Sequence, residues 1–171
     1  DSKNYYAYDN PYALSLGFLV SEKARDFTSK TNVFENHRKT AKLLMGKDVT
    51  LYQDAQITMK KTKTSLVWTA KATADGPFYM YMDCSHPDKK MYINGEYRQI
   101  YFNRFYRNLV YLGDYKKGQT VTIELRDDHD SKTDHHVLVK TLNMPVFEKM
   151  IATFQDSAWN LKEFSDGNVK A

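Results

Sequence analysis

The sequence predicts a mainly β domain, namely an antiparallel β-sandwich or jelly roll with two flanking α-helices. About six short segments rich in Tyr, Val, Ile and Thr follow one another at roughly ten-residue spacing between residues 65 and 142. Turn residues separate these segments, and none is followed by a helix that could cross over to a parallel strand. The pattern therefore favours antiparallel pairing over an α/β fold.

The strongest turn signal is Asn94-Gly95. Both central residues of a type I′ hairpin need positive φ, and Asn and Gly adopt it at the least cost. The flanking segments are therefore expected to pair as antiparallel strands, with Met91 and Ile93 on the same face. The cleanest alternation of apolar and polar residues follows at residues 120–126.

Four further segments are expected to be strands. Residues 65–74 and 78–83 flank a turn, residues 136–142 form the last strand, and residues 13–20 form an entry strand. Residues 21–31 are polar and are expected to form a loop.

Two helices are predicted beside the strands. Asn32 is the N-cap of the first, Glu35 completes a capping-box pattern, and Gly46 ends the helix. His37 lies on the apolar stripe, where a hydrogen-bonded histidine is favoured over a metal ligand because no His or carboxylate follows four residues on. Pro145 lies in the first turn of the second helix. The apolar stripe expected to pack this helix on the sandwich consists of Phe147, Met150, Ile151, Phe154, Ala158 and Leu161.

Residues 1–171 are expected to form a single domain, because a chain of this length buries about 70% of the surface that it exposes when unfolded. We assign residues 1–64 to the entry strand and the capped helix, and residues 65–144 to the sandwich core. Residues 145–164 are assigned to the packing helix and residues 165–171 to a linker toward a missing part.

Composition excludes several classes of protein. An apolar fraction of 42% with 14% aromatic residues argues against disorder, and no apolar run approaches the roughly 20 residues that span a bilayer. The net charge of +4 is spread along the chain, which does not suit nucleic-acid binding. The densest basic run, residues 60–63, is expected to be a solvated loop, with an anion-binding patch as the alternative.

The sequence contains no recognisable catalytic motif. The single cysteine, Cys84, excludes an internal disulfide and suits a small packed residue, although the nearby His86 leaves a nucleophile as the alternative. Gly-rich phosphate loops and the usual hydrolase and metalloprotease motifs are absent. We assign no catalytic residue and expect no cofactor for this chain.

Residues 126–136 hold the densest group of metal-ligating residue types. Their spacing fails the calcium-loop pattern, and two adjacent histidines in an extended segment point to opposite faces. A charged loop is therefore the main interpretation, and no metal site is assigned. The weak metal-ligand candidates are Asp128, His129 and Asp130.

Aromatic residues are the better functional signal. Seven of them lie between Tyr97 and Tyr115, with arginines among them. Exposed rings with polar tips can stack on sugar rings or anchor a protein partner, whereas rings that face the core are structural. Both interpretations stay open at this point. The candidate glycan-binding residues are Tyr101, Arg104, Phe105, Tyr106, Arg107 and Tyr111.

Several of these segments resemble the YfhO-like family of bacterial multi-pass membrane proteins. Residues 10–18 are similar to that family's N-x-Y-A-L-P-L-G-F entry strand, and residues 32–46 to its P-F-E-x-Q-N…L-x-G helix. The hairpin at residues 93–95 and the turn at residues 112–118 resemble its sandwich motif x-V-N-G-K…L-x-x-G-x-N-x-I-x-L. The chain departs from these motifs at Ser15, Asn36 and His37.

The resemblance implies a piece on the extracytoplasmic face of the bacterial cell membrane, with transmembrane helices upstream and one at the far end. It implies kinship with lipid-linked-sugar glycosyltransferases that decorate cell-envelope polymers such as lipoteichoic acid, with the catalytic carboxylates outside this sandwich. The expected role is non-catalytic recognition or positioning of a cell-envelope glycan or anionic glycopolymer. The alternatives are a structural interaction module that docks its own transmembrane domain or a partner, and a secreted hydrolase. No nucleic-acid partner is expected.

Overall fold

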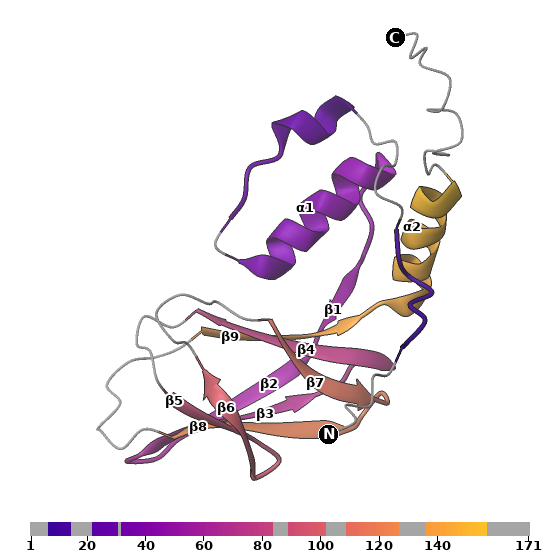
Figure 1. Ribbon diagram of the computed structural model, residues 1–171. Coiled ribbons are helices and arrows are strands. Elements are labelled where there is room, and N and C mark those ends of the chain that lie inside the picture. Colours follow the sequence, from indigo (N-terminus) through magenta and orange to yellow (C-terminus); the bar gives the residue numbers. More distant parts are fainter. Residues whose placement is uncertain are drawn as a thin grey trace, which may run out of the picture.

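The computed structural model describes residues 7–14, 22–30, 32–83, 89–101, 109–126 and 136–156. The strands in these ranges form two antiparallel sheets that pack face to face (Figure 1). The four-stranded sheet has the order β1-β9-β4-β7, and the five-stranded sheet has the order β2-β3-β8-β5-β6. The predicted antiparallel sandwich with two flanking helices is confirmed. The strands are β1 (Tyr52–Asp54), β2 (Gln56–Lys61), β3 (Ser65–Lys71), β4 (Gly76–Asp83), β5 (Lys89–Ile93), β6 (Glu96–Tyr101), β7 (Val110–Tyr115), β8 (Thr120–Arg126) and β9 (His136–Leu142).

The core lies between the two sheets because alternate residues of each strand point inward. In β8, Val121, Ile123 and Leu125 are buried while their neighbours in the strand are not, as the alternation predicts. Phe78 and Met80 of β4 meet them from the opposite sheet and are fully buried. Burial of such side chains is the main stabilising contribution to a sandwich of this kind.

The predicted hairpin forms as expected. Asn94 has φ 50° and Gly95 has φ 85°, the positive values that a type I′ turn requires. The turn pairs Ile93 with Glu96, and a register shift follows between Met91 and Tyr92. Met91 and Ile93 point into the core together.

Two strands were missing from the sequence prediction. β1 and β2 both precede residue 65, the expected start of the sandwich, and Lys60 and Lys61 belong to β2 rather than to a loop. β2 is an edge strand in which only Ile57 is partly buried, and although Ile57 and Met59 alternate with polar residues, the lysines at its end suggested a polar loop. β1 has only three residues, too few for a period to show.

The N-terminal prediction is only partly tested. Ala13 and Leu14 lie outside any strand, and residues 15–20 of the predicted entry strand lie outside the described ranges. The predicted loop at residues 21–31 contains a short 3-10 helix, η1 (Glu22–Asp26). The predicted linker, residues 165–171, also lies outside the described ranges.

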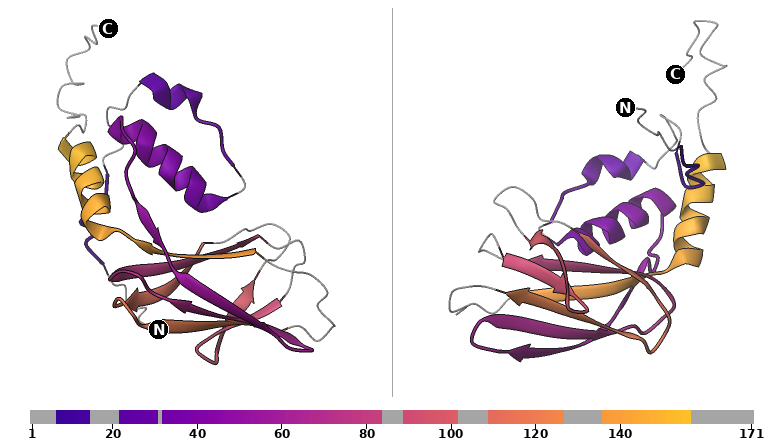
Figure 2. Two further views of the ribbon diagram at one scale, coloured as in Figure 1. Left: turned by 180° about the vertical axis from the view of Figure 1, so that it is seen from behind. Right: turned by 60° about the horizontal axis from the view of Figure 1, so that its bottom comes forward.

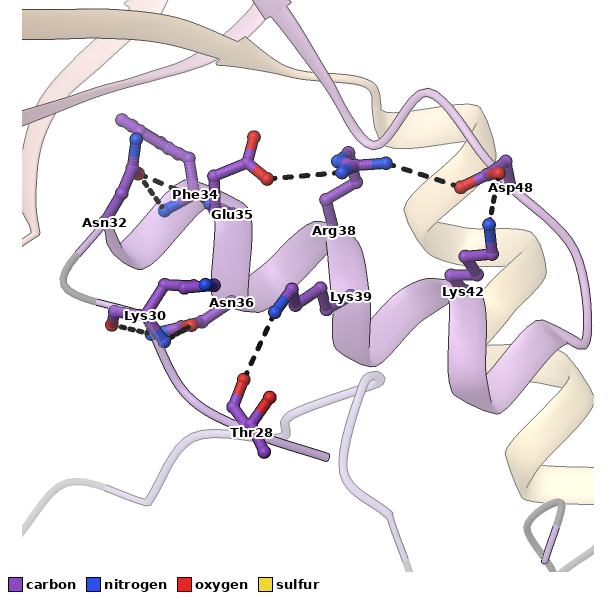
Figure 3. Close-up of polar contacts among 10 residues, drawn as sticks. All are labelled: Thr28, Lys30, Asn32, Phe34, Glu35, Asn36, Arg38, Lys39, Lys42 and Asp48. Carbon is purple, nitrogen blue, oxygen red and sulfur yellow. Dashed lines mark hydrogen bonds and ion pairs between the residues drawn. The ribbon is translucent and has the colours of Figure 1, made fainter. Parts of the chain in front are cut away.

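The first helix, α1 (Val33–Met45), begins and ends at the predicted caps. The side chain of Asn32 accepts hydrogen bonds from the backbone N–H groups of Phe34 and Glu35, and Gly46 ends the helix with φ 68°. The Glu35 carboxylate pairs with Arg38 and does not close the capping box (Figure 3).

The segment before α1 is tied to the polar side of that helix (Figure 3). Asn36 exchanges two hydrogen bonds with the backbone of Lys30, at 2.6 and 2.8 Å. The Lys39 ammonium donates to the carbonyl oxygen of Thr28 at 3.3 Å. These contacts hold residues 28–30 against α1.

The second helix, α2 (Met144–Asp156), starts at the end of β9, with Pro145 in its first turn as predicted. Both helices lie on the outer side of the four-stranded sheet (Figures 1 and 2). A second apolar cluster joins them to that sheet, with Ala41 from α1, Leu142 from β9, and Met150 and Phe154 from α2. Residues 157–164 of the predicted helix lie outside the described ranges.

The close approach of β4 to β9 predicts that Gly76 does not tolerate a side chain. Gly76 has φ 139°, and a Cβ atom there would lie 2.9 Å from the backbone oxygen of Leu142. Gly118 also has positive φ, 92°, but has open space around it. Gly118→Ala is expected to lower the free energy of unfolding by about 1 to 2 kcal/mol through backbone strain alone.

Gly76→Ala is expected to lower the free energy of unfolding by at least about 1 kcal/mol more than the Gly118 variant, because the clash adds to the strain. Urea unfolding of both variants measures the difference. Equal losses in the two variants would contradict the close approach.

Candidate functional site

The structure places the predicted glycan-binding residues unevenly. Tyr101 is the last residue of β6, but its side chain lies outside the described part. Residues 102–108, which contain the other aromatic and arginine candidates except Tyr111, are also outside it. The same holds for the metal-ligand candidates in residues 127–135 and for Cys84.

The described aromatic residues of the predicted cluster do not share one surface. Tyr97 lies on β6 of the five-stranded sheet and Tyr111 on β7 of the four-stranded sheet, and both are about half exposed, at 55% and 47%. Tyr115 is partly buried against Phe78, with 5.3 Å between ring centroids. Of the two interpretations that the sequence left open, core packing holds for Tyr115, whereas Tyr97 and Tyr111 are exposed on different sheets.

The outer face of the five-stranded sheet, here called the open face, lies on the side of the sandwich away from α1 and α2 (Figure 1). Strand register places Lys60, Val67, Glu124, Tyr92 and Tyr97 side by side across it. The rings of Tyr92 and Tyr97 form an edge contact at 5.6 Å. Tyr97 is about half exposed and Tyr92 is partly buried, and this pair of rings is here called the aromatic platform.

Hydroxyl groups lie next to this platform. Thr58, Thr69 and Thr122 form a second cross-strand row of the open face. The hairpin residue Asn94 is bound to this row, because its side-chain oxygen accepts the backbone N–H of Thr122 at 2.9 Å. The row provides short side chains that can donate and accept hydrogen bonds.

Positive charge dominates the open face. Arg126 lies with its guanidinium 3.8 Å from the centroid of the Tyr92 ring and pairs with Glu124 at 2.9 Å. The hydrogen bond from Arg126 lowers the pKa of Glu124, so this carboxylate stays ionised and neutralises the arginine. Exposed lysines that share this outward register and have no ion pair among the described residues are Lys60, Lys71 and Lys90.

The opposite side of the sandwich carries a concave site, here called the helix pocket. It has a volume of about 370 Å³ and lies between α1, α2 and the outer face of the four-stranded sheet. The rings of Tyr52 and Tyr79 contribute to it from the sheet, at 6.5 Å from each other, and Tyr111 continues the row at 5.5 Å from Tyr79. The described residues that line it are His37, Thr40, Ala41, Leu51, Tyr52, Tyr79, Leu109, Leu142, Phe147 and Met150.

His37 meets the prediction of a hydrogen-bonded histidine. Its Nδ1 is 2.9 Å from the hydroxyl of Tyr52, and the two rings stack at 5.9 Å. Burial lowers the pKa of His37 and raises the pKa of Tyr52 to about 12, so both groups are uncharged at neutral pH.

A second, polar pocket of about 270 Å³ lies at the other side of Tyr52. Arg38 in its wall is held by Glu35 at 3.2 Å and by Asp48 at 3.4 Å, and Lys42 pairs with Asp48 at 2.6 Å (Figure 3). The hydrogen bond from Lys42 lowers the pKa of Asp48, so the acid stays charged. Because these charges neutralise one another, this pocket is a poor anion site.

Within the described ranges, no group of three or more His, Cys, Asp or Glu residues is placed to hold a metal ion.

The architecture is thus that of a β-sandwich module with one helix-covered face and one open face. The family model described as bacterial membrane protein YfhO matches residues 1–171, and the chain belongs to this family. A search of curated proteins finds no match. No helix in the described part of the chain is long and apolar enough to cross a membrane.

Sequence analysis missed both surfaces, for different reasons. The open face combines outward positions of five strands, and its residues become neighbours only once the strand order is known. The alternation in β8 could have marked Glu124 and Arg126 as outward residues, but not Lys60 beside them. The helix pocket draws its lining from residues 37 to 150, and no local pattern connects these.

The buried His37 predicts a pH-dependent contribution to stability. Its folded pKa lies below its unfolded value, so the unfolded chain binds the proton more readily. This contribution is complete above about pH 6.5 and is lost as the pH falls toward the folded pKa.

We expect the urea midpoint to fall less between about pH 7.5 and about pH 5.5 in His37→Gln than in the wild type. The matched control is His136→Gln at an exposed position, which should keep the wild-type fall. An unchanged fall in the His37 variant would show that the ring is not buried as described.

Proposed function

We propose that this chain is a non-catalytic extracytoplasmic domain of a membrane glycosyltransferase-like protein, and that its open face recognises or positions an anionic cell-envelope glycopolymer such as lipoteichoic acid. The family match supports the membrane context. The observation that carries the binding proposal is the combination, on one sheet face, of the contacting rings of Tyr92 and Tyr97 with three exposed lysines that have no ion pair among the described residues.

The chemistry of the open face suits a phosphate-bearing, hydroxyl-rich polymer. Lysine ammonium groups are point charges on flexible side chains, and they attract phosphate. Such side chains can follow phosphate groups whose spacing varies along a flexible polymer. The apolar faces of sugar rings stack on tyrosine, and the threonine row can hydrogen-bond hydroxyl groups. An exposed sheet face also suits an extended polymer better than it suits a small molecule, which a concave site would enclose.

Only part of the charge is available to a ligand. The ion pair of Glu124 with Arg126 neutralises itself, so the attraction rests on Lys60, Lys71 and Lys90. These lysines are exposed, and salt screens exposed charges over a Debye length of about 8 Å at physiological ionic strength. Binding should therefore weaken strongly with added salt.

A structural interaction module was the alternative function. An apolar exposed side of α2 would favour it, but the exposed positions of the described helix are mostly polar or charged. They include Glu148, Lys149, Gln155 and Asp156. No observation on α2 therefore favours that alternative.

The proposal predicts binding of the purified chain to lipoteichoic acid and not to a neutral glucan, measured by calorimetry. Replacing Lys60, Lys71 and Lys90 together by alanine should weaken binding about tenfold or more, because the attraction is electrostatic. The matched control replaces Lys30, Lys47 and Lys149, exposed lysines outside the open face, which changes the net charge equally. Equal losses of affinity in the two triple variants would show that the attraction is non-specific and would contradict a binding site on the open face.

The aromatic platform is tested separately. Tyr97→Ala should weaken polymer binding about fivefold, since stacking contributes about 1 kcal/mol, whereas Tyr111→Ala on the opposite sheet should leave binding unchanged. Tyr101→Ala and Tyr106→Ala test the candidates predicted from the sequence in the same assay. A loss with Tyr111→Ala and none with Tyr97→Ala would move the site to the other sheet.

A further inference from the structure

We propose that the helix pocket is a second binding site, which takes a small uncharged ligand with an apolar ring and a hydroxyl group. The pocket lies on the outer side of the four-stranded sheet, across the whole sandwich from the open face. The inference goes beyond the polymer-binding proposal and does not depend on it.

The walls of the helix pocket are apolar. Leu142 of β9, Leu51 directly before β1, Ala41 of α1, and Phe147 and Met150 of α2 line it. Aromatic and aliphatic walls with a few polar groups are typical of small-molecule sites. In the pocket, the apolar part of a ligand would be removed from water and would contact the sheet, α1 and α2.

The size of the pocket suits a ring compound. Its volume of about 370 Å³ is more than twice the ~150 Å³ of an apolar cavity that takes up benzene. It opens to solvent near Thr40, which is exposed on α1, so a ligand can enter without separating the helices. A bicyclic ring with a short polar substituent fits these dimensions.

The polar groups of the pocket select against charge. None of the described residues that line it is Asp, Glu, Lys or Arg, in contrast to the polar pocket on the other side of Tyr52. His37 is uncharged at neutral pH, and its Nδ1 is already bound to the Tyr52 hydroxyl. A charged ligand would lose hydration without gaining an ionic partner among the described lining residues, and so binds more weakly than a neutral one.

A neutral hydroxyl group, by contrast, finds partners there. The second ring nitrogen of His37, Nε2, has no hydrogen-bond partner among the described residues, and Tyr79 adds a hydroxyl from the sheet. Both can donate to or accept from an alcohol. These two groups would orient the ligand, while the walls supply most of the affinity.

The test uses 2-naphthalenemethanol as the probe and 2-naphthoate as its charged counterpart, with binding to the whole chain followed by calorimetry or naphthalene fluorescence. We expect saturable binding of the alcohol below about 1 mM and at least about tenfold weaker binding of the carboxylate. Absence of saturable alcohol binding, or equal affinity for both probes, would overturn the proposal.

Two variants locate the binding. Thr40→Trp places a large side chain at the exposed mouth and should weaken alcohol binding about tenfold or more, while Thr153→Trp at an exposed position of α2 outside the pocket should not. His37→Phe should lower the affinity for the alcohol toward that for 2-methylnaphthalene, which has no hydroxyl. Unchanged binding in Thr40→Trp would place the probe elsewhere and overturn the site.

The polymer assay separates the two proposals. Thr40→Trp should leave lipoteichoic acid binding unchanged, and the triple lysine variant of the open face should leave naphthalenemethanol binding unchanged. Failure of one site therefore does not imply failure of the other. Competition between the two ligands would contradict the separation of the sites.

Discussion

Each sheet has to bury one of its faces, and the rest of the molecule depends on how the chain meets that requirement. Phe78 and Met80 of one sheet pack against Trp68 and Ile123 of the other in a single core. Because side chains alternate along a strand, the choice of inward residues also decides which residues point outward. A shift of one residue in any central strand would exchange the core and surface residues of that strand.

The two outer faces differ chemically, and this difference explains where the helices lie. The outward residues of the four-stranded sheet include Tyr52, Tyr79 and Leu142, whose apolar surface needs cover, and α1 and α2 provide it. The outward residues of the five-stranded sheet are mostly threonine, lysine and tyrosine, which tolerate water. One side of the sandwich therefore forms a pocket, and the other presents a polar sheet face.

The fold could be predicted where local chemistry is decisive. The Asn94-Gly95 turn, the caps of α1 and the alternation of β8 each depend on residues close together in the chain, and all three predictions are confirmed. β2 was missed because an edge strand has little to bury. Only Ile57 of that strand packs against the core cluster, and the lysines at its end suggested a solvated loop.

The candidate sites show what local chemistry leaves undecided. By itself the sequence determined the turns, the helix ends and the inward positions of the central strands, because short-range hydrogen bonds and sterics set them. Only the tertiary structure decided that Tyr97 and Tyr111 lie on opposite sheets, because β6 and β7 are neighbours in sequence but not in pairing. It also brought His37 to Tyr52 and opened the pocket beside them. Such contacts depend on strand order, which is set by the packing of the whole core.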